Sequence, residues 1–145
     1  MLAIASDHGG FAMKQLLIDH LKESSVEFED LGCYTEDSVD YPAYAEKAAQ
    51  GVADGVYERA ILICGTGIGM SIAANKIPGV RAALCSDCYS AEMTRLHNDS
   101  NVLCLGGRTL GIELAKRIVD IWLETPFSAM EKHARRIAMI AGMER

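Results

Sequence analysis

Short apolar runs and longer segments of helical period alternate along the chain. Five runs rich in strand-forming residues are predicted to be β-strands, and they span residues 2–6, 26–31, 60–64, 80–85 and 101–105. The runs are apolar through most of their length, which is typical of parallel strands buried on both faces. A helix candidate follows each run, so the pattern predicts a parallel sheet wrapped by helices.

Apolar stripes mark the faces by which the predicted helices pack. Between the first two strands, Leu17 and Leu21 share one helical face with Phe11 and Lys14. A cleaner stripe near the end of the chain comprises Leu110, Leu114, Ile118 and Ile121, with Trp122 beside it. We interpret both stripes as core-packing faces.

A final helix is left over from the strand–helix pairs. Pro42 suits the first turn of a helix that runs to about residue 53, and Thr125-Pro126 separates the final helix, at about residues 128–142, from the rest. That helix is expected to pack on its own sheet or on a second subunit. The prediction is a single α/β domain over residues 1–145, a Rossmann-like three-layer sandwich with a five-stranded parallel sheet and an extra C-terminal helix. The candidate strand order is 2-1-3-4-5.

Composition and charge restrict the partners. The 145 residues are 50% hydrophobic and 23% charged, which is ordinary for a globular domain. A net charge of -6 argues against nucleic acid, although a local cationic cluster could hold a small anion. No run approaches the roughly 20 apolar residues of a membrane span, so no membrane partner is expected. The N-terminus lacks signal-peptide features, and the five cysteines are expected to be free thiols in the cytoplasm.

Polar residues gather beside the predicted strands. In open parallel sheets, ligands bind outside the carboxyl ends of the strands, where the strand order reverses. Asp7 and His8 follow the first strand, and Cys64 and Thr66 follow the third, so the candidate order places them in one crevice. His97 precedes the fifth strand and is expected near the same edge, where its imidazole could exchange a proton with a sugar oxygen. His133, on the final helix, is expected to be solvated.

The segment Cys64-Gly65-Thr66-Gly67-Ile68-Gly69 is typical of an anion-binding turn. A glycine-rich turn that enters a helix presents backbone N–H groups to a phosphate, a carboxylate or a developing oxyanion. The same field favours a thiolate, so Cys64 could act as a base or nucleophile, and a buried structural cysteine explains the pattern equally well. The segment lacks the lysine of a P-loop and the arginine of a tyrosine-phosphatase loop. A dinucleotide fingerprint is interrupted at Met70, although Asp87 keeps that alternative open.

Cationic residues near the strand ends and on the final helix are candidate phosphate ligands. Arg108 follows two glycines at a strand end, and Lys132, Arg135 and Arg136 lie on the final helix. A solvated charged face is the alternative, and it is favoured for Arg135. The C-x-x-C spacing at residues 85–88 has no second pair, so no metal is expected.

Five motifs together resemble the type B ribose-5-phosphate isomerase family. They are Ser6-Asp7-His8-Gly9-Gly10, Asp40-Tyr41-Pro42, Ile63-Cys64-Gly65-Thr66-Gly67-Ile68-Gly69, Ala74-Asn75-Lys76 and His97-Asn98-Asp99-Ser100-Asn101-Val102. The family includes the sister galactose-6-phosphate and allose-6-phosphate isomerases. The resemblance implies interconversion of D-ribose 5-phosphate and D-ribulose 5-phosphate, in the pentose phosphate pathway, through a cis-enediolate and without metal or organic cofactor.

The resemblance also implies a role for each candidate residue. Cys64 would be the base that moves a proton between C2 and C1, and Asn75 stands where another branch of the family has a glutamate base. The enediolate would lie in an anion hole formed by Gly65, Thr66, Gly67 and Gly69. Asp7 and His97 would open the furanose ring. The sugar hydroxyls would be held by Asn98 and Tyr41, and the phosphate by His8, Arg108, Lys132 and Arg136.

Members of the family are dimers or dimers of dimers, with sites that combine residues of two chains. The resemblance therefore implies a homodimer or homotetramer in which the final helix contacts a partner. The alternatives are an allose-6-phosphate or galactose-6-phosphate isomerase, and a non-catalytic sensor of sugar phosphates or nucleotides. The presence of both Cys64 and His97 argues against a sensor, because binding a phosphate requires neither.

Overall fold

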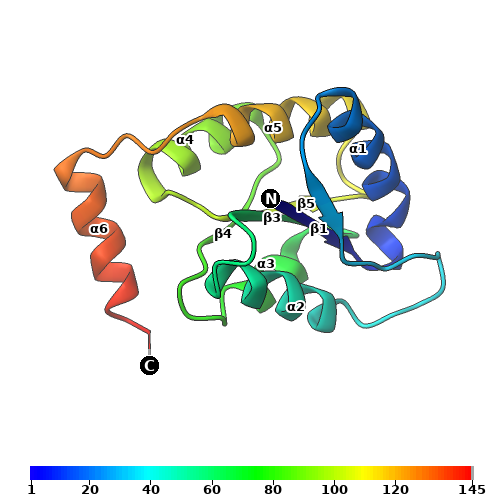
Figure 1. The fold of residues 1–145 in the computed structure, drawn as a ribbon, viewed down its shortest axis with the longest axis horizontal. Coiled ribbons are helices and arrows are strands. Elements are labelled where there is room, and N and C mark those ends of the chain that lie inside the picture. Colours follow the sequence, from blue (N-terminus) through cyan, green and yellow to red (C-terminus); the bar gives the residue numbers. More distant parts are fainter. Residues whose placement is uncertain (145) are drawn as a thin grey trace.

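A five-stranded parallel sheet forms the middle layer of the protein in the computed structural model, which describes residues 1–144 (Figure 1). The strands are β1 (Leu2–Ser6), β2 (Phe28–Asp30), β3 (Arg59–Cys64), β4 (Ala82–Leu84) and β5 (Val102–Gly106). One face is covered by α1 (Phe11–Glu23), α4 (Cys88–Asn98) and α5 (Ile112–Glu124). The other face is covered by α2 (Tyr41–Ala53) and α3 (Ile68–Ala74). This arrangement confirms the predicted three-layer α/β class and a helix after every strand.

The strand order is β2-β1-β3-β5-β4, so the candidate order 2-1-3-4-5 is wrong in its last two places. β5 pairs with β3 along its length, and β4 lies at the edge. All five residues of β5 are buried, whereas the three residues of β4 are partly or fully exposed. A fully apolar strand suits the centre of a sheet, and a short strand suits an edge. β1 and β3 remain neighbours, so their carboxyl ends lie side by side as predicted.

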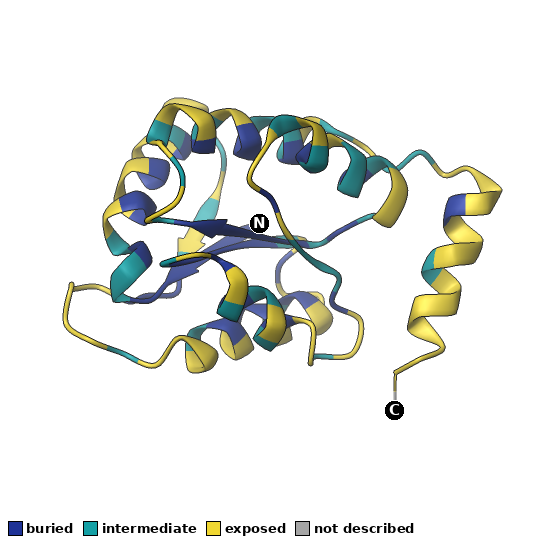
Figure 2. Ribbon diagram, turned by 180° about the vertical axis from the view of Figure 1, so that it is seen from behind, coloured by how far each residue is buried: buried dark blue, intermediate teal, exposed yellow. Residues whose placement is uncertain are grey.

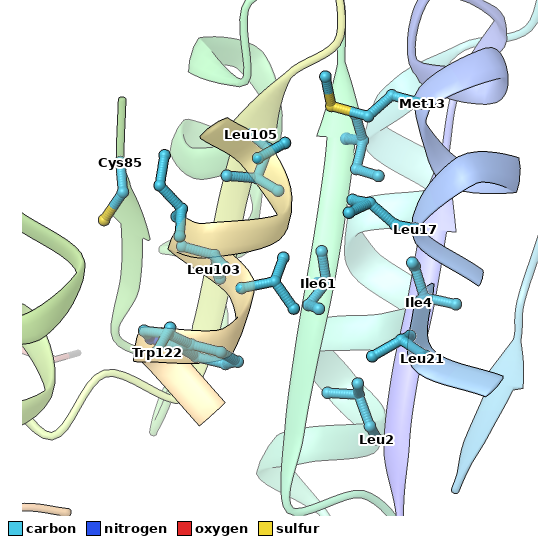
Figure 3. Close-up of a cluster of buried hydrophobic side chains, with 14 of the residues drawn as sticks. Leu2, Ile4, Met13, Leu17, Leu21, Ile61, Cys85, Leu103, Leu105 and Trp122 are labelled. Atoms are coloured by element: carbon cyan, nitrogen blue, oxygen red, sulfur yellow. The ribbon is translucent and has the colours of Figure 1, made fainter. Parts of the chain in front are cut away.

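Alternate residues of the central strands form the two halves of the core. Leu2, Ile4, Ile61, Leu103 and Leu105 face α1 and α5, and Figure 3 shows them in one cluster with Leu17, Leu21 and Trp122. The opposite half includes Ala3, Ala5, Leu62, Val102 and Cys104, which face α2 and α3. The core position predicted for Trp122 is confirmed, since it has no exposed surface.

The buried helix faces differ in part from the predicted stripes. On α5 the buried residues are Ala115, Ile118, Val119 and Trp122, whereas Leu114 is 37% exposed. The predicted stripe was therefore displaced by about one position around the helix. On α1, Lys14 is fully buried among apolar neighbours.

The final helix, α6 (Glu131–Ala141), stands away from the sheet and packs beside α4, and just beyond it the Glu144 carboxylate accepts a hydrogen bond from the Gly79 N–H at 2.8 Å. Figure 2 shows it exposed along almost its whole length, with His133 as its buried residue. Of the two predicted alternatives, packing of α6 on its own sheet is wrong. The helix starts later than predicted because the Ser128 hydroxyl accepts a hydrogen bond from the Met130 N–H at 3.2 Å, and Met130 caps the helix in an extended conformation. Within residues 1–144, no helix has the length and apolar character needed to cross a membrane.

Candidate active site

The carboxyl ends of β1, β3 and β5 are joined to one another by backbone hydrogen bonds. The Asp7 N–H donates to the Ile63 carbonyl at 3.1 Å, which joins β1 to β3. The Gly107 N–H donates to the Cys64 carbonyl at 2.8 Å, and the Arg108 N–H donates to the Gly65 carbonyl at 2.9 Å. These bonds fix the loop after β3 between the loops that carry Asp7 and Arg108.

Cys64 closes β3 and lies at the amino end of α3. Its Sγ accepts a hydrogen bond from the Gly67 N–H at 3.1 Å, and the residue is 5% exposed. Gly67 has a φ of 78°, a left-handed conformation that favours glycine, and it lets the chain turn from the loop into α3. A hydrogen bond donated to sulfur stabilises the thiolate more than the thiol. The turn therefore provides a donor at the atom where a base would carry negative charge.

Other cysteines of the core lack this environment. Burial raises the pKa of the Cys85 thiol to about 11, and burial also raises the pKa of the Cys104 thiol. Both side chains therefore remain protonated near neutral pH. Cys64 differs from both, because it lies at the carboxyl end of β3 and its sulfur accepts a hydrogen bond from a backbone N–H.

The rest of the loop contacts α2. Thr66 is exposed, and its Oγ1 accepts a hydrogen bond from the Ile68 N–H at 3.2 Å. Gly69 lies against Tyr41, the first residue of α2, so closely that a Cβ at Gly69 would come within 2.5 Å of the tyrosine ring. Glycine is thus required at this position for Tyr41 to approach the loop.

Asp7, His8 and Arg108 surround the start of α1. The Asp7 carboxylate is 7% exposed and accepts a hydrogen bond from the Gly10 N–H at 3.1 Å. The His8 Nδ1 accepts a hydrogen bond from the Val39 N–H at 3.2 Å, so its Nε2 is the nitrogen that can donate to a ligand. The Arg108 guanidinium lies beside Gly9, where a Cβ would come within 3.4 Å of its Cζ. We call Asp7, His8, Tyr41, the loop of residues 64–69 and Arg108 the carboxyl-edge cluster.

His97 and Asn98 lie at the opposite edge of the sheet. A helix that follows a parallel strand runs back along it, so the end of α4 reaches the edge where the strands begin. The Asn98 carbonyl accepts a hydrogen bond at 2.9 Å from Nε of Arg81, which directly precedes β4. The prediction that His97 lies near the carboxyl ends of the strands is therefore wrong within one chain.

His97 instead contacts the final helix. Its ring lies against that of His133, with centroids 4.3 Å apart. Lys132 and Arg136 are exposed on α6 beside this pair. The chain thus carries a second group, which we call the α6 cluster and which comprises His97, Asn98, Lys132 and Arg136.

His133 is buried, so the expectation that it is solvated is wrong. Its Nδ1 lies 2.6 Å from the Ser128 hydroxyl, which ties α6 to the segment before it. Burial lowers the pKa of His133, and the nearby positive charges of His97, Lys132 and Arg136 lower it further. The docked imidazole is therefore neutral near pH 7.

Acidification should release α6. An exposed His133 binds a proton more readily than the docked one, so docking is strongest above the ordinary histidine pKa of 6.5 and weakens as the pH falls through the lowered value. We expect hydrogen exchange of α6 amides, corrected for the intrinsic rate, to accelerate several-fold between about pH 7.5 and about pH 5.5. His133→Phe keeps a ring but cannot titrate, and it should remove this acceleration. Equal acceleration in both proteins would contradict the assignment.

Two further predicted candidates have structural roles. The Asn75 amide donates to the Ala82 carbonyl at 3.0 Å and accepts from the Ala82 N–H at 2.8 Å, so it joins α3 to the edge strand. Asp87 caps α4, and hydrogen bonds from Ser90 lower its pKa. Both carboxyl oxygens of Asp87 are therefore engaged with Ser90, which weakens the dinucleotide alternative.

Sequence reasoning missed two residues next to the carboxyl-edge cluster. Val39 carries the N–H that contacts His8, and a backbone donor leaves no mark in the sequence. Lys14 is a buried cation, and its position on an otherwise apolar helical face was the available signal. Among residues 1–144, no group of three or more histidine, cysteine or acidic side chains could hold a metal ion.

Comparison with known proteins identifies the family. Residues 2–140 match the model of the Ribose/Galactose Isomerase family. The chain belongs to this family. Ribose-5-phosphate isomerase B of Escherichia coli is 47% identical over 143 residues, which cover 99% of this chain and 95% of the relative. A putative sugar phosphate isomerase of Bacillus subtilis is 48% identical over 144 residues, which cover 99% and 96%.

A solved structure extends the likeness to the fold. Ribose-5-phosphate isomerase B of Clostridium thermocellum superposes with a TM-score of 0.96 at 47% identity, over 98% of this chain and 95% of that one. The ribose/galactose isomerase fold therefore accounts for nearly the whole chain, α6 included.

Proposed function

We propose that the chain is an aldose–ketose isomerase that interconverts D-ribose 5-phosphate and D-ribulose 5-phosphate in the pentose phosphate pathway. The observation that carries this proposal is the hydrogen bond from the Gly67 N–H to Cys64 Sγ, in a loop that lies beside Asp7 and Arg108. Membership of the chain in the ribose/galactose isomerase family supports the same reaction class. The free thiols suit a reducing compartment, and the cytoplasm remains the predicted location.

The reaction begins with opening of the furanose ring, because the cyclic sugar has no carbonyl group to acidify C2. One group removes the proton from the C1 hydroxyl while another protonates the ring oxygen, and the bond between C1 and the ring oxygen breaks. Asp7 and His97 are our candidates for this pair. The buried carboxylate of Asp7 is held in place by the Gly10 N–H, as a group that moves a proton must be.

Isomerisation follows on the open aldehyde. The Cys64 thiolate takes the proton from C2, and the electron pair moves through the new C1–C2 double bond onto the oxygen of C1. Backbone N–H groups of the loop would stabilise this enediolate, and those of Gly65, Thr66 and Gly69 are the candidates, because the Gly67 and Ile68 N–H groups already donate to Cys64 and Thr66. The proton of the C2 hydroxyl then passes to the oxygen of C1 as the thiol returns its proton to carbon C1, which leaves a carbonyl at C2 and a hydroxyl at C1, the ketose.

The substrate phosphate needs several donors. His8 directly precedes Gly9, and the Arg108 guanidinium lies beside Gly9, so these two residues of the carboxyl-edge cluster would provide one side of a phosphate site. Lys132 and Arg136 of the α6 cluster would provide the other side. The resemblance to the family implies an arginine at the position of Lys132, and lysine contributes charge without the planar fork that binds two phosphate oxygens at once. Tyr41 and Asn98 would hold sugar hydroxyls.

The separation of the two clusters supports a site that is shared between copies of the chain. Neither cluster alone holds both the proposed base and both ring-opening groups. α6 exposes the apolar residues Met139 and Ile140, and α3 exposes Ile68 and Ile72. A hollow of about 780 Å³ also separates the end of α6 from α3 and β4. We infer a homodimer or homotetramer in which the carboxyl-edge cluster of one copy meets the α6 cluster of another.

A side-by-side turnover assay tests this function. The purified protein, treated with a chelator, is expected to convert ribose 5-phosphate faster than allose 6-phosphate or galactose 6-phosphate, because one additional carbon changes the distance from base to phosphate. Conversion of all three can be followed by proton NMR in one buffer. Binding of ribose 5-phosphate without turnover would support the sensor alternative, and faster turnover of a hexose phosphate would assign a sister activity.

A further inference from the structure

Lys14 is a cation inside the apolar core. It has no exposed surface and lies on the face of α1 that also buries Leu17, Ile18 and Leu21. Its Nζ lies 2.6 Å from Oδ1 of Asp30. A buried ion pair seldom stabilises a fold more than an apolar pair of the same shape, and its best-supported use is to specify one conformation. The residues that contact this ammonium show which conformation it specifies.

The turn after β2 is organised around the Lys14 ammonium. Besides Asp30, the ammonium donates to the Cys33 carbonyl and lies 5.3 Å from the centre of the Tyr34 ring. The Asp30 carboxylate also accepts from the Gly32 N–H at 2.9 Å, and the Tyr34 hydroxyl donates to the Asp30 carbonyl at 3.1 Å. Residues 30–34 are therefore held by one charge from α1.

The same turn is bonded to the strand that leads into His8. The Ser6 N–H donates to the Gly32 carbonyl at 2.7 Å, and the Cys33 N–H donates to the Ser6 carbonyl at 2.8 Å. The segment then runs out from the sheet and returns to α2 (Figure 1). Near its end the Val39 N–H donates to Nδ1 of His8. The segment of residues 31–40 thus contacts residues 6–8 both near its beginning and near its end.

The bond from Val39 selects one tautomer of His8. A neutral imidazole has one N–H, and a nitrogen that accepts a hydrogen bond cannot carry it. With Nδ1 accepting, the proton lies on Nε2, and Nε2–H can donate to a phosphate oxygen. The position of residue 39 therefore decides which nitrogen of His8 is available to a ligand.

We propose that Lys14 is a positioning residue for the substrate phosphate. It anchors the segment of residues 31–40, so that the Val39 N–H holds His8 as the Nε2–H tautomer. This inference rests on the proposed function, in which His8 binds the phosphate of the sugar. Lys14 itself lies in the core and does not touch the substrate.

Steady-state kinetics test the inference. Lys14→Met keeps the length of the side chain and removes the charge, and we expect the KM for ribose 5-phosphate to rise about tenfold while kcat stays within about threefold, because a phosphate contact is lost and Cys64 is untouched. Leu17→Ala is the matched control. Leu17 is equally buried on the same helical face, and the core cluster to which it belongs includes no residue of the segment, so the KM of Leu17→Ala should stay at the wild-type value when the protein is folded.

Nitrogen NMR of the histidine rings tests the link directly. The chain has four histidines, and the His8 signals can be assigned by their loss in His8→Gln. At about pH 8, wild type should show the Nε2–H tautomer at His8, and Lys14→Met should show a mixture of tautomers. Val39→Pro removes the donor N–H from an exposed segment, so it should reproduce the tautomer mixture and the higher KM even if Lys14→Met does not fold.

Three results would overturn the inference. They are a folded Lys14→Met with wild-type KM and tautomer, a Leu17→Ala protein with an equal rise in KM, and a Val39→Pro protein with an unchanged tautomer. Absence of turnover in the wild type would instead reject the proposed function. In that case the tautomer measurement would still test whether Lys14 determines the tautomer of His8.

Discussion

Cys64→Ala is expected to lower kcat by about 10³-fold or more, since a positioned base commonly contributes that much and alanine cannot take a proton. The KM for ribose 5-phosphate should change little, because His8 and Arg108 do not depend on the sulfur for their positions. Gly67 donates to the sulfur, and its left-handed conformation should persist without that bond. Turnover and binding can be measured on the same preparation.

Cys104→Ala is the matched control for this variant. Cys104 lies on β5, the neighbour of β3, and it is fully buried with a thiol that burial keeps protonated. The loss of one buried sulfur there should lower stability modestly and leave kcat near the wild-type value. Equal losses of activity in the two variants would show that Cys64 acts through packing and not as a base.

Two inactive variants are expected to restore each other. Cys64→Ala damages the carboxyl-edge cluster, and His97→Ala damages the α6 cluster. If each site combines one cluster from each of two copies, a hetero-oligomer of these variants contains one doubly damaged site and one intact site. Hetero-oligomers isolated with two affinity tags should therefore recover about half of the wild-type activity per site.

A second pair of variants tests whether mixing restores activity merely because it stabilises the folded protein. Cys64→Ala and Asp7→Asn both damage the carboxyl-edge cluster, so every site of their hetero-oligomer is defective and no activity should return. A hetero-oligomer of Cys64→Ala and His97→Ala as inactive as its parents would contradict the shared site. The proposed role of α6 would fail with it.

Local patterns predicted the elements of the fold, and long-range pairing decided what they missed. All five strands form at the predicted runs, and the runs at β1, β3 and β5 are buried, whereas the edge strands β2 and β4 are shorter than predicted and only partly buried. The order of β4 and β5 depends on which strand can tolerate an edge. β5 is five residues long and fully buried, whereas β4 has three residues and is partly exposed, so β4 is the strand that suits the edge. The prediction instead placed the strands in the order in which they follow one another along the chain.

The candidate site was predictable where residues follow strands directly. Asp7, His8 and Cys64 lie at the predicted edge because parallel strands end together. His97 lies at the end of α4, and this helix runs back towards the edge where the strands begin. Its closeness to the fifth strand in the sequence therefore suggested the wrong edge of the sheet. The contact between Val39 and His8 joins residues 31 positions apart through a backbone atom, and no sequence pattern records it.

Solvent exchange at the C2 carbon of the sugar tests the role of Cys64 most directly. With wild-type protein in deuterium oxide, the account predicts that deuterium enters the C2 position of ribose 5-phosphate and the C1 position of ribulose 5-phosphate, because the thiol proton exchanges with solvent while the enediolate is held. Cys64→Ala should bind the sugar and incorporate almost no deuterium. Exchange at the wild-type rate in Cys64→Ala, measured by proton NMR, would show that another group takes the proton and would contradict the account.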